Sequence, residues 1–355
     1  MMIPTKIPPM IFTPLLGWGT KIRMGLDYFR GVSAEVPPER SVAEFIRDHY
    51  GQETVDYLAD PLLSGVYGGT AEALSVDAVL PRFVDMERKY GSLTKGALAA
   101  RKHMPKGGES AALFRTLKRG LGSLVAAIES KLEGVRRITG EVEALDRAET
   151  GAGWRVRVGR EWLAASQVIL AVPAYASGAL LRHLDPEAAR LLETVDYSSS
   201  ATVALAYRPG RLQQALKGFG FLVPRVEGRT LRALTVVQNK FPNRAPEGYN
   251  LLRCFLGGAG RQAILDAPDE VLLEAVMYDL RRMLGIREQP DHIRINRWHR
   301  GMAQYTLGHG NRMGQAQARV KALGGIHLAG NAYSGIGIPD CIRTGQQAAA
   351  ACVVK

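Results

Sequence analysis

The sequence predicts an α/β fold in which a β-rich section interrupts the α/β layers and a helical section precedes both. Three observations support this prediction. The apolar run Val168–Val172, which ends at Pro173, is typical of a buried parallel strand. Residues 324–341 have the pattern of a short strand, a glycine turn and the start of a helix. Residues 201–256 lie between these two stretches and hold short β-rich segments separated by turns, which indicates an antiparallel sheet.

The helical section begins after a proline-broken apolar start. Ser41 and Glu44 form a capping box, so a helix is expected from Val42 onward. Ser64–Gly69 holds three glycines in six residues, which predicts a loop rather than a helix, and a tight packing corner is favoured over a functional role. Lys102–Glu109 contains a proline and two glycines and predicts a flexible excursion.

The next part of the chain has its own helix and strands. After Gly120, the apolar residues Leu121, Leu124, Val125, Ile128 and Leu132 share one face of a predicted helix that ends at Gly134. We expect the following strands and helix from alternation and periodicity: strands at Val135–Ile138, Glu141–Asp146, Trp154–Val158, Ala201–Tyr207, Phe219–Val223, Leu231–Val237, Tyr249–Leu256 and Ile293–Trp298, and a helix at Pro268–Leu284.

Composition excludes several classes of protein. A net charge of +12 would suit nucleic acid, an anionic membrane surface or an acidic substrate, but the basic residues are scattered and no nucleic-acid-binding motif is present. We therefore expect no nucleic acid partner. The three cysteines are widely spaced and the seven histidines have no metal-ligand spacing, which predicts neither a disulfide framework nor a metal cluster and suits a reducing compartment.

The N-terminal run Ile7–Trp18 is apolar, but it is broken by prolines and too short to span a bilayer. No other apolar run approaches the roughly 20 residues that a span needs. The sequence therefore predicts a cytoplasmic protein. Together with Lys21 and Arg23 this run could rest on an anionic membrane surface, and an internal proline-rich loop is the alternative.

The glycine-rich stretch Gly324–Cys341 is the strongest candidate for a ligand site. Its glycines let backbone approach a ligand, and the helix start at Pro339 offers unpaired N–H groups and a partial positive charge. An ordinary strand-to-helix corner is the alternative. No strand followed by G-x-G-x-x-G and a helix occurs, and the nearest candidate, Gly120–Ser123, lacks the third glycine and a preceding strand. A pyrophosphate cradle is therefore not expected.

Three segments taken together resemble one family. Ser64–Gly69, Gln304–His309 and Leu328–Ile342 are similar to segments of the protoporphyrinogen/coproporphyrinogen oxidase family, within the flavin amine oxidoreductases. The resemblance implies an FAD-binding Rossmann-type domain, incomplete in this chain, with an inserted β-rich substrate domain and a helical section. The domains it implies are a helical substrate- and membrane-facing section at 1–112, FAD-domain portions at 113–200 and 296–355, and a β-rich substrate domain at 201–295.

The same resemblance assigns cofactor-binding residues. Val142 would lie beside the FAD adenine, and Gly330 and Asn331 would approach the phosphates and the ribityl chain. The helix that starts at Pro339 would aim its positive end at the flavin. The residues implied at the flavin ring or its edge are Ile336, Gly337, Ile338, Trp298 and Gln304.

Gly65 resembles the glycine that lets a tetrapyrrole lie close to the flavin. The chemistry implied is removal of hydride from a porphyrinogen to FAD, with oxygen reoxidising the flavin, in heme biosynthesis. The resemblance assigns no catalytic side chain, because the cofactor itself accepts the hydride. The resemblance does not choose between coproporphyrinogen and protoporphyrinogen, and it leaves peripheral membrane contact and a homodimer open.

The sequence departs from the family in two places. Arg119-Gly120 stands where the family has a pair of glycines, and the family's N-terminal G-x-G-x-x-G unit has no counterpart, so the chain resembles a member that starts partway through. A truncated non-catalytic remnant or a tetrapyrrole-binding module is therefore a second hypothesis. A flavin amine oxidase with another substrate is a third, which Ser64–Gly69 and Ile338–Cys341 disfavour.

Overall fold

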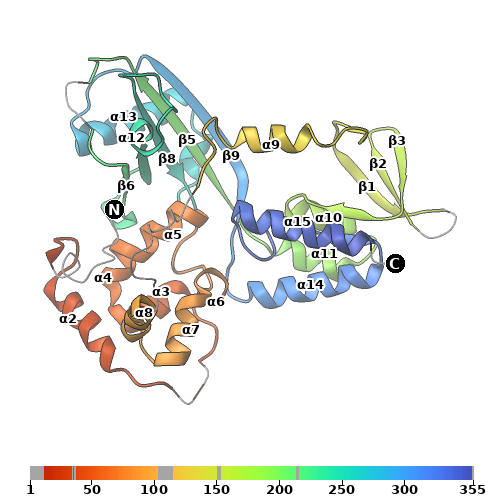
Figure 1. The fold of residues 1–355 in the computed structure, drawn as a ribbon, viewed down its shortest axis with the longest axis horizontal. Helices are drawn as coiled ribbons and strands as arrows, with labels where there is room; N and C mark the ends of the chain where they lie inside the picture. Colours follow the sequence, from red (N-terminus) through yellow and green to blue (C-terminus); the bar gives the residue numbers. More distant parts are fainter. Residues whose placement is uncertain are drawn as a thin grey trace.

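The N-terminal part of the protein is a cluster of short helices. The structure is a computed structural model that describes residues 12–353, apart from residues 34, 36, 103–114, 150–152 and 213–215. The helices gather in one body, drawn in red to orange at the lower left of Figure 1. They are α2 (Trp18–Leu26), η1 (Asp27–Phe29), α3 (Val42–Tyr50), α4 (Gln52–Thr54), η2 (Val55–Ala59), α5 (Asp60–Tyr67), α6 (Val76–Val79), α7 (Pro81–Tyr90) and α8 (Leu93–Lys102).

The predicted capping box is confirmed at the start of α3. The Ser41 hydroxyl accepts a hydrogen bond from the Glu44 N–H at 3.1 Å, and the Glu44 carboxylate accepts from the Ser41 N–H at 2.9 Å. This exchange satisfies two donors that the first turn of a helix leaves free. The flexible excursion predicted at Lys102–Glu109 lies, from residue 103 on, outside the described residues, as do the first five residues of the run Ile7–Trp18.

The prediction of a loop at Ser64–Gly69 is wrong for most of that segment. Helix α5 runs on to Tyr67, and the chain turns only at Gly68, which has a left-handed φ of 64°. The helix forms despite its glycine because Pro61 and Leu63 are buried in the core, and tertiary packing outweighs a weak local propensity. Gly65 therefore lies on a helix, where a Cβ would come 3.2 Å from the Leu222 side chain.

Helix α9 (Gly122–Glu129) and a three-stranded antiparallel sheet follow, in the order β1 (Val142–Arg147), β2 (Trp154–Val158) and β3 (Glu161–Ala165). The predicted helix and the strands at Glu141–Asp146 and Trp154–Val158 are confirmed. The strand predicted at Val135–Ile138 is wrong, because the structure gives that segment no strand partner among the described residues. The apolar face of α9 is not covered by the described residues: Leu121, Val125, Ile128 and Leu132 are 41–56% exposed.

A two-stranded parallel sheet joins distant parts of the chain. Strand β4 (Val168–Leu170) pairs in parallel with β10 (Ile326–Leu328), with Val168 opposite Ile326. The predicted parallel strand is confirmed, but its complete burial is wrong, because Leu170 is 6% exposed while Ile169 is 40% exposed. Helices α10 (Ala174–Leu181) and α11 (Pro186–Glu193) follow β4, while α14 (His309–Leu323) precedes β10 and α15 (Ile338–Val353) follows it. These four helices lie together on the right of Figure 1.

The β-rich section is a five-stranded sheet that is antiparallel throughout, as predicted. Helix α13 (Asp269–Leu284) covers one face and also matches its prediction. The sheet extends from residue 197 to residue 303, beyond both ends of the domain expected at 201–295. Its strands, in spatial order, are β6 (Gly220–Leu222), β7 (Ala233–Val236), β8 (Asn250–Gly257), β5 (Tyr197–Tyr207) and β9 (His292–Ala303), with α12 (Val237–Lys240), η3 (Arg225–Glu227) and η4 (Ala263–Asp266) in the connections.

Alternation along β5 gives this sheet one core face and one open face. Ala201, Val203 and Leu205 are fully buried in a cluster that also contains Leu272 and Val276 of α13. Successive side chains of a strand point to opposite faces, so the polar residues Ser200 and Thr202, which alternate with them, belong to the other face. That other face lines a cavity. Ser198, two residues earlier, lines the same cavity as Ser200 and Thr202. Among the described helices none is long and apolar enough to cross a bilayer.

Candidate functional site

Two cavities meet at one residue of β9. The larger has a volume of about 640 Å³ and lies between the open face of the five-stranded sheet and α5. The smaller, of about 590 Å³, is lined by residues that follow β4 and β10 and by α15. Gly301 lines both, so a ligand in one cavity would lie beside a ligand in the other. Both volumes are in the range of small-molecule sites.

The smaller cavity lies at the carboxyl ends of the two parallel strands. Val172 follows β4, and Gly330 and Asn331 follow β10; all three line the cavity. Crevices at this edge of a parallel sheet are the usual ligand sites of open α/β folds. Gly330 has a φ of 120°, which L side chains rarely adopt, and a Cβ there would meet no atom within 4 Å. Glycine is needed at this turn for its conformation, and the space in front of it is open.

Tyr305 holds the glycine turn in place. Its hydroxyl donates to the Asn331 carbonyl at 2.8 Å and accepts from the Gly335 N–H at 2.8 Å. Its ring stacks on His309 with centroids 3.9 Å apart. Burial, and to a lesser degree Arg312, lowers the pKa of His309 to about 4, so this imidazole is neutral at pH 7. The turn is therefore fixed by an uncharged, buried pair rather than by an ion pair.

Helix α15 begins beside this turn, at Ile338. The Asp340 carboxylate accepts from the Gly337 N–H at 3.3 Å and pairs with Arg343 at 2.8 Å. The positive end of the helix thus already faces a carboxylate of its own first turn, which reduces the partial charge left for a ligand. Ile336 lines the smaller cavity, whereas Gly337 and Ile338 lie outside its lining.

Arg300 occupies strained backbone between the two cavities. Its φ is 45°, and its N–H donates to the Ser199 hydroxyl at 2.9 Å, where the β5–β9 register is interrupted by a bulge. Its guanidinium lies 3.7 Å from the centre of the Tyr175 ring, and both residues line the smaller cavity. A bulky residue in left-handed conformation at a bulge is typical of functional sites. Arg300 was not among the site residues predicted from the sequence.

The larger cavity is lined by aromatic and cationic side chains. Three cations contribute to it, Arg232, Lys240 and Arg253, and its described lining contains no aspartate or glutamate. Because opposite charge attracts and apolar area favours flat hydrophobic groups, the cavity suits an apolar ligand that carries negative charge. Its aromatic residues are Phe219, Phe221, Phe255 and Trp298.

The structure brings together only part of the predicted site. Gly65 and Trp298 line the larger cavity, while Gly330, Asn331 and Ile336 line the smaller one. The remaining predicted residues lie outside both linings. Gln304 is buried and donates to the Tyr67 carbonyl at 2.6 Å, so it ties α5 to the sheet, and Val142 is a 38% exposed residue at the start of β1.

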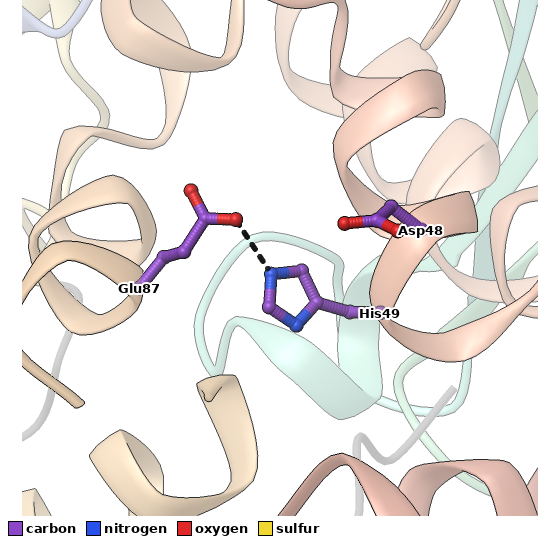
Figure 2. A group of neighbouring side chains, drawn as sticks. All are labelled: Asp48, His49 and Glu87. Atoms are coloured by element: carbon purple, nitrogen blue, oxygen red, sulfur yellow. Dashed lines mark hydrogen bonds and ion pairs between the residues drawn. The ribbon is translucent and has the colours of Figure 1, made fainter. Parts of the chain in front are cut away.

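A second cluster of charged residues lies in the helical section, away from both cavities. The ligand atoms of Asp48, His49 and Glu87 lie within 4.8 Å of one another, as a metal site would require (Figure 2). However, the His49 Nδ1 is 2.6 Å from the Asp27 carboxylate and its Nε2 is 3.1 Å from that of Glu87. Arg40 lies 2.5 Å from Glu87 and 3.6 Å from Asp48. Since these groups already have partners, the cluster is an ion-pair network that holds η1, α3 and α7 together.

Comparison with known proteins places the chain in a family. Residues 2–353 match the family described as flavin containing amine oxidoreductase. The chain is 33% identical to coproporphyrinogen III oxidase of Bacillus subtilis (strain 168), over 98% of this chain and 74% of that relative. It is 29% identical to protoporphyrinogen oxidase 1, chloroplastic, of Arabidopsis thaliana, over 96% of this chain and 68% of that relative.

A solved structure agrees with these relatives. It comes from Exiguobacterium sp. 255-15 and is described provisionally as a protoporphyrinogen oxidase; it has a TM-score of 0.83 and 31% identity, over 98% of this chain and 75% of that one. The chain belongs to the flavin containing amine oxidoreductase family. As a member of this family it is an oxidoreductase, and the cofactor that the family implies is a flavin.

The smaller cavity fits the ring of a flavin. Its volume of about 590 Å³ is adequate, and its turn at Gly330 leaves open space where a side chain would otherwise project. Tyr175 and Tyr197, with ring centroids 5.1 Å apart, supply aromatic surface at its wall. Arg300 supplies positive charge for a ring that becomes more negative when it is reduced.

Proposed function

We propose that this protein oxidises a porphyrinogen to the porphyrin in heme biosynthesis, with FAD as cofactor and oxygen as the final electron acceptor. One observation carries the proposal: an aromatic cavity lined by three cations adjoins the smaller, flavin-fitting cavity at Gly301. A porphyrinogen is a large apolar macrocycle with carboxylate side chains, which matches this lining. The names of the relatives from Bacillus subtilis and Arabidopsis thaliana support the same substrate class.

Within that class we propose coproporphyrinogen III as the preferred substrate. It carries more carboxylates than protoporphyrinogen IX, and the larger cavity offers Arg232, Lys240 and Arg253 without a lining carboxylate to repel it. The same lining disfavours a flavin amine oxidase, because an amine is a cation at neutral pH and would meet three like charges.

The protein's own residues would hold the flavin and the macrocycle in place rather than transfer protons. Gly330, Asn331 and Ile336 would line the flavin ring, and a bound flavin would accept the hydride removed from the macrocycle. Gly301, without a side chain, would let the two ligands approach. Gly65 would allow α5 to close on Leu222 and form one wall of the larger cavity. Exclusion of water by this wall would protect the reduced flavin.

The proposal is tested with the purified 355-residue chain. We expect it to hold FAD through gel filtration and to raise the rate of porphyrin fluorescence from coproporphyrinogen III above the rate without enzyme, more than from protoporphyrinogen IX. The same chromatography measures the molecular mass and thereby tests a homodimer. Porphyrin binding without flavin binding or oxidation would instead favour the tetrapyrrole-binding module.

We also propose peripheral contact with a membrane through α2 and η1. Trp18, Ile22, Leu26 and Phe29 recur at helical spacing and are 60–78% exposed. The neighbouring cation Lys21 lies 4.6 Å from the centre of the Trp18 ring. An exposed apolar stripe beside basic residues is the pattern of a helix that lies in the interface of a membrane.

If α2 and η1 contact a membrane, substituting their exposed apolar residues should weaken binding to vesicles. Ile22→Glu with Phe29→Glu should reduce co-sedimentation with phosphatidylglycerol vesicles by roughly tenfold or more, since each buried apolar side chain contributes about 1.5–3 kcal/mol. Val271→Glu is the matched control, because Val271 is a 47% exposed apolar residue on the distant α13. Equal vesicle binding by all three proteins would contradict this contact.

A further inference from the structure

Arg232 is a buried residue of the larger cavity. It precedes β7, where its N–H donates to the Phe255 carbonyl at 2.9 Å and its carbonyl accepts from the Val223 N–H at 2.8 Å. These bonds fix its backbone beside strand β8. The residue is only 7% exposed and is one of those that line the cavity. The guanidinium is therefore held at the wall of a cavity rather than in open solvent.

This guanidinium has no partner within the described part of the chain. Its Nε is buried without a hydrogen bond, and no ion pair of 4.0 Å or less joins Arg232 to a carboxylate there. The nearby carboxylates are engaged by Arg225, which lies 3.7 Å from Asp60 and 3.1 Å from Glu72. A buried charge without a partner is destabilising, and natural proteins rarely retain one unless it acts on a ligand.

Other positive charges near Arg232 further favour binding of an anion. Arg261 donates to the carbonyls of Arg229 and Arg225 at 2.6 Å and 3.1 Å, so a second guanidinium is fixed close by. No carboxylate among the described residues forms an ion pair with it. Burial, together with the positive charge of Arg261, lowers the pKa of Arg232. A carboxylate at this position would relieve both the burial cost and the repulsion.

We propose that Arg232 is the binding residue for a carboxylate of the ligand in the larger cavity. Arginine presents a planar fork that pairs with a carboxylate through two parallel hydrogen bonds. Lys240 and Arg253 line the same cavity but are exposed, so salt screens them and they contribute mainly to attraction over distance. That the ligand is a tetrapyrrole rests on the proposed function; that it carries a carboxylate rests on Arg232 itself.

The test compares acids with their esters on matched variants of the full chain. The first probe pair is coproporphyrin III and its tetramethyl ester, and the second is 1-pyrenebutyrate and its methyl ester, each followed by fluorescence. Arg232→Met keeps most of the apolar stem and removes the charge. Arg294→Met is the control, because Arg294 is an exposed arginine of β9 on the same face of the sheet and outside both cavity linings.

We expect Arg232→Met to weaken binding of both acids by roughly 10- to 100-fold, the usual value of a charge-assisted hydrogen bond, and to leave the esters unchanged. Arg232→Lys should recover part of the loss. Because Arg232→Met removes an unpaired buried charge, its thermal unfolding midpoint should equal or exceed that of the original protein. Arg294→Met should bind all four probes normally.

The outcomes separate this proposal from the proposed function. Equal loss of acid and ester in Arg232→Met, or no loss in either, would overturn the carboxylate role while porphyrin binding itself stands. Arg232-dependent binding of 1-pyrenebutyrate without any porphyrin binding would support the carboxylate role and contradict the tetrapyrrole substrate. Failure of the original protein to prefer either acid over its ester would contradict the carboxylate role and the preference for coproporphyrinogen III, but not porphyrin binding itself.

Discussion

Replacing Gly220 with alanine is expected to detach β6 from the sheet and to open the larger cavity. Gly220 has a φ of 138°, and an added Cβ would lie 2.0 Å from the Leu234 carbonyl oxygen and 2.9 Å from the Thr235 Cα. Both are backbone atoms of β7, so no side-chain rotation can relieve the clash. Gly220, Phe221 and Leu222 all line the larger cavity, and their displacement would remove one of its walls.

The expected cost combines backbone strain and overpacking, about 2–5 kcal/mol in the free energy of unfolding. Coproporphyrin III binding should fall by at least roughly tenfold, because the wall of the site moves. Denaturant unfolding and porphyrin fluorescence measure the two effects. Gly218→Ala is the matched control: Gly218 also has a left-handed φ, 77°, but a Cβ there meets no atom within 4 Å.

Gly218→Ala should therefore cost only the strain of its backbone, about 1–2 kcal/mol, with little change in porphyrin binding. If the two variants unfold and bind alike, the contact between Gly220 and Leu234 does not determine the position of β6. If Gly220→Ala is destabilised but binds porphyrin normally, β6 is not a wall of the binding site.

His49→Ala should lower the free energy of unfolding by about 3–5 kcal/mol. His49 and Asp27 have fully buried side chains, with the His49 Nδ1 2.6 Å from the carboxylate, and Figure 2 shows the second contact, from His49 to Glu87. Removing the imidazole leaves the Asp27 carboxylate buried with one partner fewer. The free energy of unfolding, from denaturant titration, measures this loss.

His183 provides a matched control, because its Nε2 lies 2.7 Å from Asp146 but its side chain is 53% exposed. His183→Ala should cost less than about 1 kcal/mol, since water screens exposed ion pairs. Similar costs for the two alanine variants would show that burial does not strengthen the His49 pair, contrary to this interpretation.

Because of the same cluster, the free energy of unfolding should depend on pH under acid conditions. Burial alone would raise the pKa of Asp27, but hydrogen bonds from the Thr94 N–H, His49 and Ser92 outweigh it and hold the pKa below its ordinary value of 3.8. A depressed folded-state pKa gives stability that is complete above the ordinary value and is lost as the pH falls below it. His49→Ala should therefore flatten the decline of unfolding free energy between pH 4 and more acid conditions, roughly the window in which Asp27 is protonated.

Local chemistry made part of the fold predictable. The capping box of Ser41 and Glu44, the alternation of Trp154–Val158 and the periodicity of α13 each involve residues close in sequence, and the structure confirms all three. The turn that leads into α15 follows from its glycines for the same reason. Helix and strand periods, caps and turns are read directly from neighbouring residues.

Segments with weak or ambiguous local signals were predicted less well. Ser64–Gly69 has glycines that favour a loop, but burial of Pro61 and Leu63 keeps α5 helical as far as Tyr67. Val135–Ile138 has β-branched residues that suit a strand, but a strand needs a partner to pair with. In the first segment, packing of α5 into the core outweighed the local signal; in the second, the described residues offer no strand to pair with.

The sequence by itself determined the α/β class, the antiparallel insert, the glycine turn at Gly330 and the resemblance to one family, because these depend on local patterns. Only the tertiary structure decided that Gly301 joins two cavities, that Arg300 and Tyr175 stack at the smaller one, and that Arg232 is buried without a partner. These features are assembled from strands and helices far apart in the chain. Whether a charge is paired or a cavity is cationic depends on distances in space, which residue spacing does not contain.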